Sequence, residues 1–387
     1  METLHPGVYV EEVSSGVNPV TSLGTSTAAF IGAAEKGPVD KALLITSVLA
    51  FQQNYGNHLK DQWLSHCVQQ FFANGGGRLY IARVIPQTGS VTAEQEYQRG
   101  FALLDAITDI NLVAVPGVGT PSMIRYGAEY CQQRKDCFFI GEMALSDDSA
   151  RKAGDFIKNL NCKCSYGAVY FPWLKLKAMR RASAGPQFIP PSGAIAGLYA
   201  RTDAVRGVWK APAGTHASLN GVVGLSVNIS DAEQDILNPS GVNVIREFPA
   251  HGIVAWGART LGTQTDPEFR YVPVRRTAIY LQQSIYRSIG WAVFEPNDEN
   301  LWSRLRLNIQ HFLTRLFRAG AFQGQTQNQA FFVKCDSETT TQIDIDNGMV
   351  NLVVGFAPLK PAEFVMLKFS QKTGVSSRGD QLAPRSS

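Results

Sequence analysis

The chain has 387 residues, of which 44% are hydrophobic and 18% charged, and its formal net charge is +4. This composition indicates an ordered globular protein with a large core, and so weak a positive charge does not indicate nucleic-acid binding unless the cations are clustered. No stretch reaches the roughly 18–20 apolar residues of a membrane span, and the first residues lack the basic start and apolar run of a signal peptide. We therefore expect a cytosolic protein without direct membrane insertion.

The first predicted element is a strand over residues 8–13, in the segment PGVYVEEV. A Pro-Gly pair precedes this strand, and a Ser-Ser-Gly turn follows it. No Asn-Gly or Asp-Gly hairpin turn returns a partner strand, so its backbone donors and acceptors lack a local partner.

Short strands and helices are expected over residues 23–86. STAAFIGAAEKGP predicts a strand that ends at a Gly-Pro turn, and LLITSVLAFQQNYG predicts a strand and a helix that begins at a Thr-Ser cap and ends at Gly56. The next helix places Leu64, Val68, Phe71 and Phe72 on one face and ends at three glycines. A strand over residues 79–85 follows.

Residues 93–175 alternate between predicted helices and buried strands. The series β-α-β-α-β favours a mostly parallel sheet with right-handed crossovers. The loop PGVGTP after the first buried strand contains neither a G-x-G-x-x-G pattern nor the Lys-Ser/Thr of a P-loop. We interpret it as a turn and not as a phosphate-binding loop.

The second half of the chain begins with residues 187–250, which we expect to be rich in loops. A strand-like segment around Trp256 follows, and residues 269–290 predict a strand that runs into a helix. Residues 297–319 predict a long amphipathic helix, capped by Asn297 or Asp298 and ended by Gly320. Three strands are expected in AFFVKCD, GMVNLVVGFAP and AEFVMLKFSQ, and residues 374–387 predict a disordered polar tail.

The residues that could carry chemistry are scattered. Six cysteines and six histidines are present, but only Cys162 and Cys164 lie close together, and no set has the spacing of a zinc site. No G-x-S-x-G nucleophile motif occurs. We therefore predict no catalytic residues, no metal site and no cofactor, although a catalytic triad assembled only by the fold stays possible.

The long helix predicted over residues 297–319 has an unusual distribution of charge. Its apolar stripe lies on one side, and Arg304, His311, Arg315 and Arg318 gather on another, where no acidic residue follows Glu299. A solvated helix face explains this pattern, but surfaces usually mix both signs of charge. The alternative is an acidic partner, which could be nucleic acid, a membrane surface or a protein.

Several segments, in the same order along nearly the whole chain, resemble the sheath proteins of contractile phage tails and related injection systems. The resemblance rests on PGVYVEEV, STAAFIGAAEKGP, FFANGGGRLYIARV, PPSGAIAGLYARTDAVRGVWKAPAG, YVPVRRTAIYLQQSI, WAVFEPNDENLW and GFAPLKPAEFVMLKFSQ. Each segment is weak evidence alone, and the ordered series is specific. The chain is short for this family and is more similar to a compact injection-system sheath.

The resemblance implies a mixed α+β and α/β fold. A central β-α-β domain with a mostly parallel sheet would accompany a core domain built from the N- and C-terminal segments, with extended strand arms. The implied division is an N-terminal arm (1–22), a tube-facing sheath core (23–86 and 245–370), an outer α/β domain (87–244) and a flexible tail (371–387).

The resemblance also implies a non-enzymatic function. The subunit would polymerise helically around an inner tube, with six-fold rings, and contract to drive the tube through a target cell envelope. The implied partners are other copies of the chain, the inner tube protein, and baseplate and terminator or cap proteins, without nucleic acid. Assembly would take place in the bacterial cytoplasm, as part of a phage tail or phage tail-like particle.

The resemblance assigns roles to both chain ends and to the long helix. The terminal arms would add strands to sheets of neighbouring subunits by β-augmentation. The arm residues would be Val8, Tyr9, Val10, Glu11, Phe364, Val365, Met366, Leu367 and Phe369. Pairing of the two terminal strands within one subunit is the alternative. Arg304, His311, Arg315 and Arg318 would face acidic groups on the tube.

Two other classes of function are kept as alternatives. A nucleic-acid-binding structural protein would use the same arginine face, and binding would weaken steeply with salt. An α/β enzyme would use the sheet of residues 93–175 and would carry a cofactor or metal. The sequence does not distinguish a phage tail, a bacteriocin-like particle and a cell-anchored injector.

Overall fold

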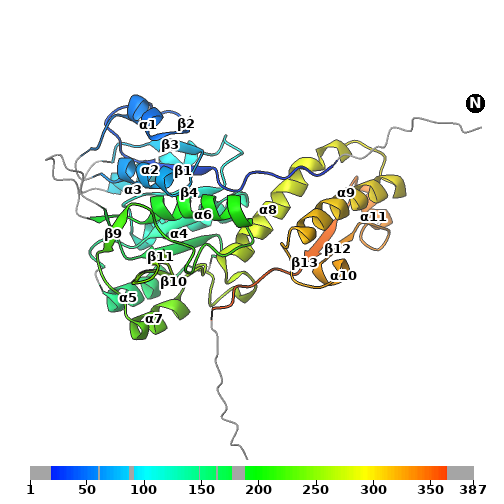
Figure 1. Cartoon of the computed structure of the whole chain (residues 1–387). Helices are drawn as coiled ribbons and strands as arrows, with labels where there is room; N and C mark the ends of the chain where they lie inside the picture. Colours follow the sequence, from blue (N-terminus) through cyan, green and yellow to red (C-terminus); the bar gives the residue numbers. More distant parts are fainter. Residues whose placement is uncertain are drawn as a thin grey trace, which may run out of the picture.

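The computed structural model describes residues 19–59, 62–86, 91–147, 149–162, 164–176 and 188–363. These residues form a larger and a smaller lobe, and helix α8 (Val272–Ser288) runs from one to the other (Figure 1). Each lobe has its own hydrophobic cluster. Both predicted arm strands, residues 8–13 and 364–369, lie outside the described residues.

The larger lobe is built on an eight-stranded sheet of order β11-β10-β6-β5-β4-β1-β3-β2. Neighbours from β10 through β3 run parallel, and only the edge strands β2 and β11 are antiparallel. The predicted parallel sheet is thus confirmed. The strands are β1 (Ala28–Gly32), β2 (Leu43–Ile45), β3 (Leu79–Arg83), β4 (Leu112–Ala114), β5 (Phe138–Glu142), β6 (Gly167–Phe171), β10 (Val242–Phe248) and β11 (Gly252–Ala255).

Helices cover both faces of this sheet because its strands are apolar on both sides. Phe30 of β1 packs on Phe71 of α2 (Leu64–Ala73), with ring centroids 5.7 Å apart, and Phe138 of β5 lies 6.4 Å from Tyr199 of α6 (Ser192–Arg206). The next residue of β5, Phe139, points to the other face, toward α3 (Val91–Ala102) and α4 (Pro121–Arg134).

Smaller elements complete the larger lobe. A three-stranded antiparallel sheet of order β8-β7-β9 adjoins the main sheet. These elements are α1 (Val48–Tyr55), α5 (Ala150–Leu160), β7 (Leu174–Leu176), β8 (Phe188–Ile189), β9 (Val222–Leu225), α7 (Asp231–Leu237) and the 3-10 turns η1 (Asn238–Ser240) and η2 (Pro267–Phe269).

The expectation of loops over residues 187–250 is wrong. Helix α6 occupies 15 of these residues, and its first nine, from Ser192 to Ala200, are buried. A helix enclosed on all sides has no polar face, so it shows no helical period in the sequence. Gly193 and Gly197 suggested a loop, but they let α2 approach closely: a Cβ at Gly197 would lie 2.4 Å from the Phe71 carbonyl oxygen.

The smaller lobe is organised by α9 (Glu299–Arg318), which has the predicted Asp298 cap and is followed by Gly320 at φ 78°. Its apolar stripe packs on β12 (Phe331–Lys334), which pairs with β13 (Val353–Phe356) in a two-stranded antiparallel sheet. The turn η3 (Gly290–Ala292) and helices α10 (Gln327–Ala330) and α11 (Gln342–Asp346) complete the lobe. The prediction of a strand before α8 is wrong, because Tyr271 forms an isolated bridge with Arg259 and belongs to no strand.

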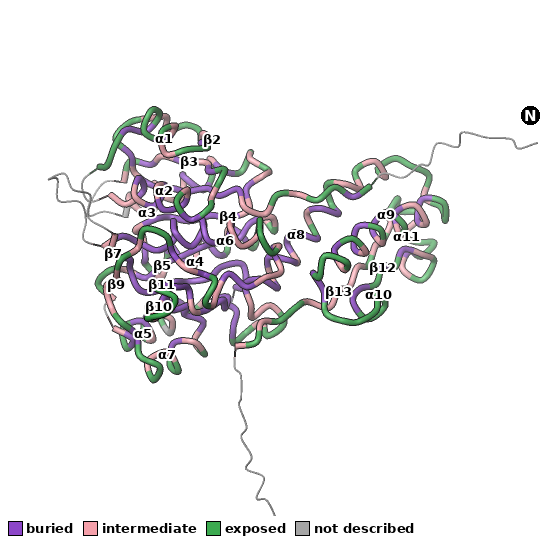
Figure 2. Tube along the Cα trace, in the orientation of Figure 1, coloured by how far each residue is buried: buried purple, intermediate pink, exposed green. Residues whose placement is uncertain are grey.

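The sheet continues across the expected domain boundary at residue 87. Strands β1 and β3, from residues 23–86, lie in the same sheet as β4, β5 and β6, from residues 87–244. In Figure 2 the sheet and α6 are buried, whereas the smaller lobe is exposed over much of its outer side. No helix among the described residues is long and apolar enough to cross a membrane.

Candidate assembly surfaces

The N-terminal segment lies along α8 between the lobes (Figure 1). The Thr21 amide donates to Ser288 Oγ at 3.1 Å, and the Leu23 amide donates to Ser284 Oγ at 3.4 Å. Val20 is buried in the hydrophobic cluster of the smaller lobe, and its carbonyl accepts from Arg315 at 2.7 Å. The segment therefore enters the molecule on a fixed path.

A buried ion pair between α8 and α6 anchors this segment. Arg276 of α8 donates to the Asp203 carboxylate of α6 at 2.5 and 2.9 Å, and both side chains are only 4% exposed. Thr25 joins the pair from the N-terminal segment: its hydroxyl donates to Asp203 at 2.6 Å, and its carbonyl accepts from Arg276 at 2.9 Å. Three segments that are far apart in sequence thus meet at one buried charge pair.

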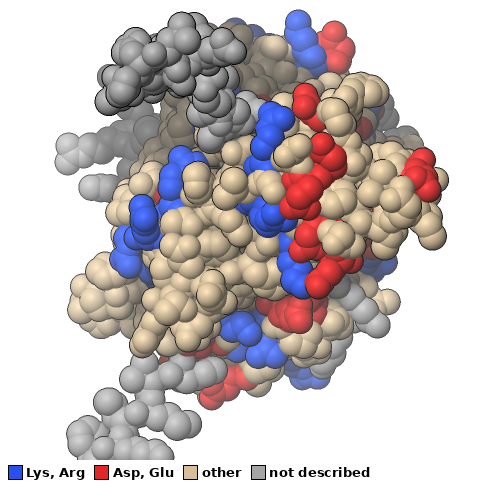
Figure 3. Space-filling view, turned by 90° about the vertical axis from the view of Figure 1, so that its right-hand side faces the viewer, with Lys and Arg blue, Asp and Glu red and all other residues tan. Residues whose placement is uncertain are grey.

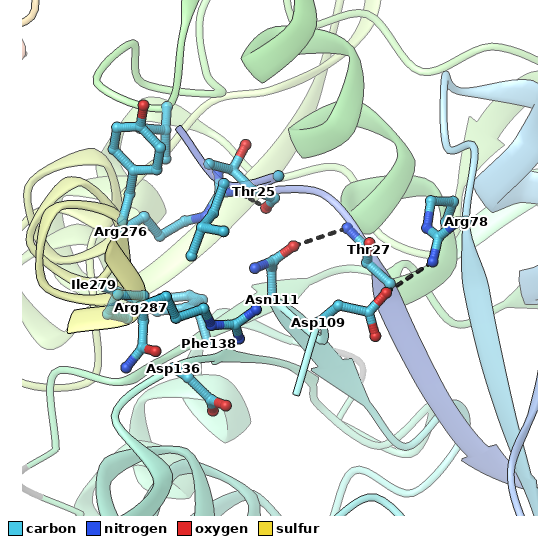
Figure 4. A pocket seen from close by; sticks show the side chains of 15 residues that line it. Thr25, Thr27, Arg78, Asp109, Asn111, Asp136, Phe138, Arg276, Ile279 and Arg287 are labelled. Atoms are coloured by element: carbon cyan, nitrogen blue, oxygen red, sulfur yellow. Dashed lines mark hydrogen bonds and ion pairs between the residues drawn. The ribbon is translucent and has the colours of Figure 1, made fainter. Parts of the chain in front are cut away.

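A cavity of about 230 Å³ lies beside this pair (Figure 4). Its walls come from the N-terminal segment, α8 and the residues that precede the strands, with Thr27 donating to Asn111 and Arg78 paired with Asp109 at 2.7 Å. The cavity therefore lies at the amino ends of the parallel strands. Open α/β sheets bind ligands at the carboxyl ends, so this position does not indicate an active site.

The carboxyl ends of the strands are held together by Glu142, which is 1% exposed. Its carboxylate accepts from the Gly117 amide at 2.5 Å and from the Ser192 amide at 3.2 Å, which links the PGVGTP loop, β5 and α6. Burial raises the pKa of Glu142 to about 7. The described residues contain no group of three or more His, Cys, Asp or Glu that could hold a metal.

The described chain ends at a second charge pair. Arg259, which is 8% exposed, donates to the Glu363 carboxylate at 2.5 and 2.9 Å, and the Tyr271 hydroxyl donates to it at 3.2 Å. Arg259 also donates to the Asn238 carbonyl. These contacts hold Glu363 against the larger lobe. Neither this pair nor the Arg276–Asp203 pair was predicted, because the partners are 104 and 73 residues apart and share no local motif.

The sheet of β12 and β13 is open. No other described strand pairs with it. Its inner face packs on α9 through Phe331 and Val333, while its outer face exposes Phe332 at 53% and Val353 at 45%. A sheet with free edges and an apolar outer face is suited to accept strands from other chains.

The four residues predicted to face the tube differ in their surroundings. Arg304 lies over the Trp291 ring at 4.5 Å and pairs with Glu295 at 3.4 Å, and Arg315 binds the Val20 carbonyl. His311 and Arg318 are exposed, without a hydrogen bond or ion pair to the described residues. Acidic side chains lie beside basic ones on this side of the molecule (Figure 3): Glu295, from the loop before α9, pairs with Arg304, and Glu299, at the start of α9, pairs with Arg306.

Family models match most of the chain in two successive parts. The phage tail sheath protein central domain matches residues 91–261, and the phage tail sheath C-terminal domain matches residues 264–372. The tail sheath protein of Vibrio phage KVP40 is 31% identical over 184 residues, which are 47% of this chain and 26% of that protein. For a putative prophage major tail sheath protein of Pseudomonas aeruginosa strain UCBPP-PA14, the identity is 25% over 286 residues, 71% of this chain and 69% of that protein. The chain thus spans about a quarter of the phage KVP40 protein.

Solved structures match over almost the full length. The helical sheath of the anti-feeding prophage (AFP) in its contracted state superposes with a TM-score of 0.78 at 31% identity, covering 96% of this chain and 100% of that chain. The PVC sheath complex of an extracellular contractile injection system, also contracted, gives a TM-score of 0.77 at 31% identity, covering 96% and 99%. The resemblance found in the sequence is therefore confirmed, and the chain belongs to the phage tail sheath family.

Proposed function

We propose that this chain is the structural subunit of a contractile sheath in a phage tail-like particle. The full-length match to the AFP helical sheath carries this proposal. Copies polymerise helically around an inner tube during assembly in the bacterial cytoplasm. The sheath then contracts and drives the tube through a target envelope. Baseplate and terminator or cap proteins close its ends.

Strand exchange joins the copies. The donor strands are Val8–Glu11 of one copy and Phe364–Phe369 of another, and the acceptor is the open β12–β13 sheet. The free edges and the exposed Phe332 support this assignment. Main-chain hydrogen bonds at the free edges would supply affinity, and side chains of the added strands would lie beside Phe332 on the outer face.

Anchored chain ends allow the bodies to move while the connections persist. Thr25 is held by the Arg276–Asp203 pair and Glu363 by Arg259, so a displacement of either arm is transmitted to the body at these points. The free energy of contraction comes from larger interfaces in the contracted state, without nucleotide hydrolysis.

The smaller lobe faces the tube, and α9 carries the contact. His311 and Arg318 are the side chains available to acidic groups on the tube. Arg304 and Arg315 instead form contacts within the protein, with Glu295 and the Val20 carbonyl. Exposed charge contacts are weak and screened by salt, which suits a surface that must release the tube.

Electron microscopy of the purified protein, alone and co-expressed with the inner tube protein, tests the proposal. We expect hollow tubes of regular diameter without added nucleotide or DNA. Deletion of residues 1–16 should abolish them, whereas deletion of residues 374–387 is the matched control and should leave them intact. Monomers that persist even with the tube protein present would refute the sheath assignment. Normal tubes from the deletion of residues 1–16 would refute strand exchange alone.

A further inference from the structure

Phe294 is the most conspicuous side chain on the smaller lobe. It is fully exposed, and its neighbour Val293 is 65% exposed. Its backbone has φ 69°, in the left-handed region that a bulky residue rarely adopts. Exposing an aromatic side chain on a strained backbone costs free energy, and a partner that covers the side chain would offset this cost.

The loop that carries Phe294 is fixed on both sides. Asn297 accepts from the Trp302 indole at 2.8 Å and donates to the Met349 carbonyl at 3.0 Å. Arg304 lies over the Trp291 ring and pairs with Glu295. These contacts hold the chain on both sides of Phe294, which lowers the backbone entropy that the loop loses when it binds.

A hollow of suitable size lies at the end of α6 in the larger lobe. Its volume is about 310 Å³, and its apolar part consists of Val205, Ala211, Ala213 and Ala217. A cavity of only ~150 Å³ lined by apolar side chains binds benzene in another protein. The hollow can therefore admit a phenyl ring, and Val205, 73% exposed at its rim, gains burial when it is filled.

The rim of this hollow is positively charged. Arg201, Arg206 and Lys210 line it together with His216, and no carboxylate lines it. None of the three cations forms an ion pair with a described residue. Burial and the nearby Arg206 lower the pKa of Lys210, as expected for uncompensated positive charge.

The loop around Phe294 has the complementary charge. Glu295 follows it directly, and Asp298 and Glu299 lie within the next five residues. All three are exposed; Glu295 pairs with Arg304, Glu299 pairs with Arg306, and Asp298 caps α9. Each carboxylate can accept further hydrogen bonds, so a phenyl ring flanked by three carboxylates matches an apolar hollow with a basic rim, and the arginines of the rim can also contact the ring face.

We propose that Phe294 of one copy of this chain inserts into the α6 hollow of the next copy. The two surfaces lie in different lobes (Figure 1), so the contact is heterologous, and repetition of it generates an open helical polymer and not a closed dimer. The proposal rests on the self-assembly proposed above and adds a contact to the strand exchange.

Site-directed cross-linking tests the contact. We expect the double variant Phe294→Cys, Val205→Cys to give, on oxidation of assembled sheath, a ladder of dimers, trimers and longer oligomers. The matched control pairs Phe294→Cys with Val223→Cys, which is also exposed, on β9, and should give no ladder. Dimers from Phe294→Cys alone would indicate a symmetric contact between two loops and would overturn the proposal.

The substitution Phe294→Asn separates assembly from folding. Asparagine tolerates the left-handed backbone, so the monomer should unfold at the same or a higher temperature. Loss of a buried aromatic anchor should raise the concentration needed for assembly roughly tenfold or more. An unchanged assembly concentration would refute the contact while the sheath function stands. Absence of wild-type tubes even with the inner tube protein present would refute the sheath function itself.

Discussion

Removal of the Asp203 carboxylate tests whether the buried ion pair anchors the N-terminal segment. In Asp203→Ala, Arg276 loses both charge-assisted hydrogen bonds at 2.5 and 2.9 Å, and the Thr25 hydroxyl loses its acceptor. Because Arg276 is 4% exposed, its guanidinium is left buried without a counter-charge. Breaking a buried pair from one side costs about 3–5 kcal/mol. That is a large part of the roughly 5–15 kcal/mol that stabilises a folded domain.

Urea and thermal unfolding of the monomer measure this loss. At about 2 °C per kcal/mol for a chain longer than 150 residues, the Tm should fall by about 6–10 °C. Hydrogen exchange at the Leu23 amide should accelerate as well, because the segment is held at Thr25. The matched control is Glu338→Ala, which removes the exposed Lys334–Glu338 pair and should change stability by less than about 1 kcal/mol.

Two results would refute this reasoning. A loss in Asp203→Ala no larger than that in Glu338→Ala would mean that the pair is not a structural anchor. Full stability with faster exchange across the whole larger lobe would place the effect outside the N-terminal segment. The double variant Asp203→Leu, Arg276→Met should recover part of the lost stability, since it leaves no unpaired charge.

Three further predictions concern pH, packing and the open sheet. The pKa of Glu142 is raised from 4.5 to about 7, so its contribution to stability is complete below about pH 4.5 and is lost as the pH rises through 7. Urea titrations should show the free energy of unfolding fall by roughly 1.4 kcal/mol per pH unit across that window, and Glu142→Gln should not show this fall. An equal pH dependence in the wild type and in Glu142→Gln would contradict the prediction. Gly197→Ala should lower stability by about 1–3 kcal/mol, because the added Cβ would meet the Phe71 carbonyl oxygen. The control Gly154→Ala on α5, where no atom lies within 4 Å of the added Cβ, should be neutral or stabilising. Equal effects of the two substitutions in thermal unfolding would refute the close packing of α2 on α6. Phe332→Asp should leave monomer stability within about 1 kcal/mol of wild type but prevent tube formation. Lys334→Asp is the control on the same exposed face. Normal tubes from Phe332→Asp, seen by microscopy, would argue against β12–β13 as the strand acceptor.

Segments with a regular hydrophobic period, or with clear cap and turn residues at their ends, were predictable from the sequence. The β-α-β series of residues 93–175 gave parallel strands in sequence order, and α9 begins at its Asp298 cap. Such features depend on residues within a few positions of one another. Helix α6 was missed because burial on every side removes the polar face by which a helix is recognised.

The charge distribution on α9 shows a different limit. The helix itself lacks acids beside Arg304, as its sequence indicates, but Glu295 reaches Arg304 from the preceding loop. A helical wheel includes only the residues of one helix, so it cannot show counter-charges from elsewhere. Of the four residues predicted to contact an acidic partner, His311 and Arg318 therefore stay available, because both are exposed and neither is paired with a described residue.

The sequence by itself determined the family, the parallel sheet and the long amphipathic helix, because ordered local motifs and hydrophobic periods carry that information. Only the tertiary structure decided which charges are anchors and which are surface. Arg276 meets Asp203, and Arg259 meets Glu363, across separations that no local pattern records. The same holds for the Phe294 loop and the α6 hollow, since their exposure and shape exist only once the two lobes are folded.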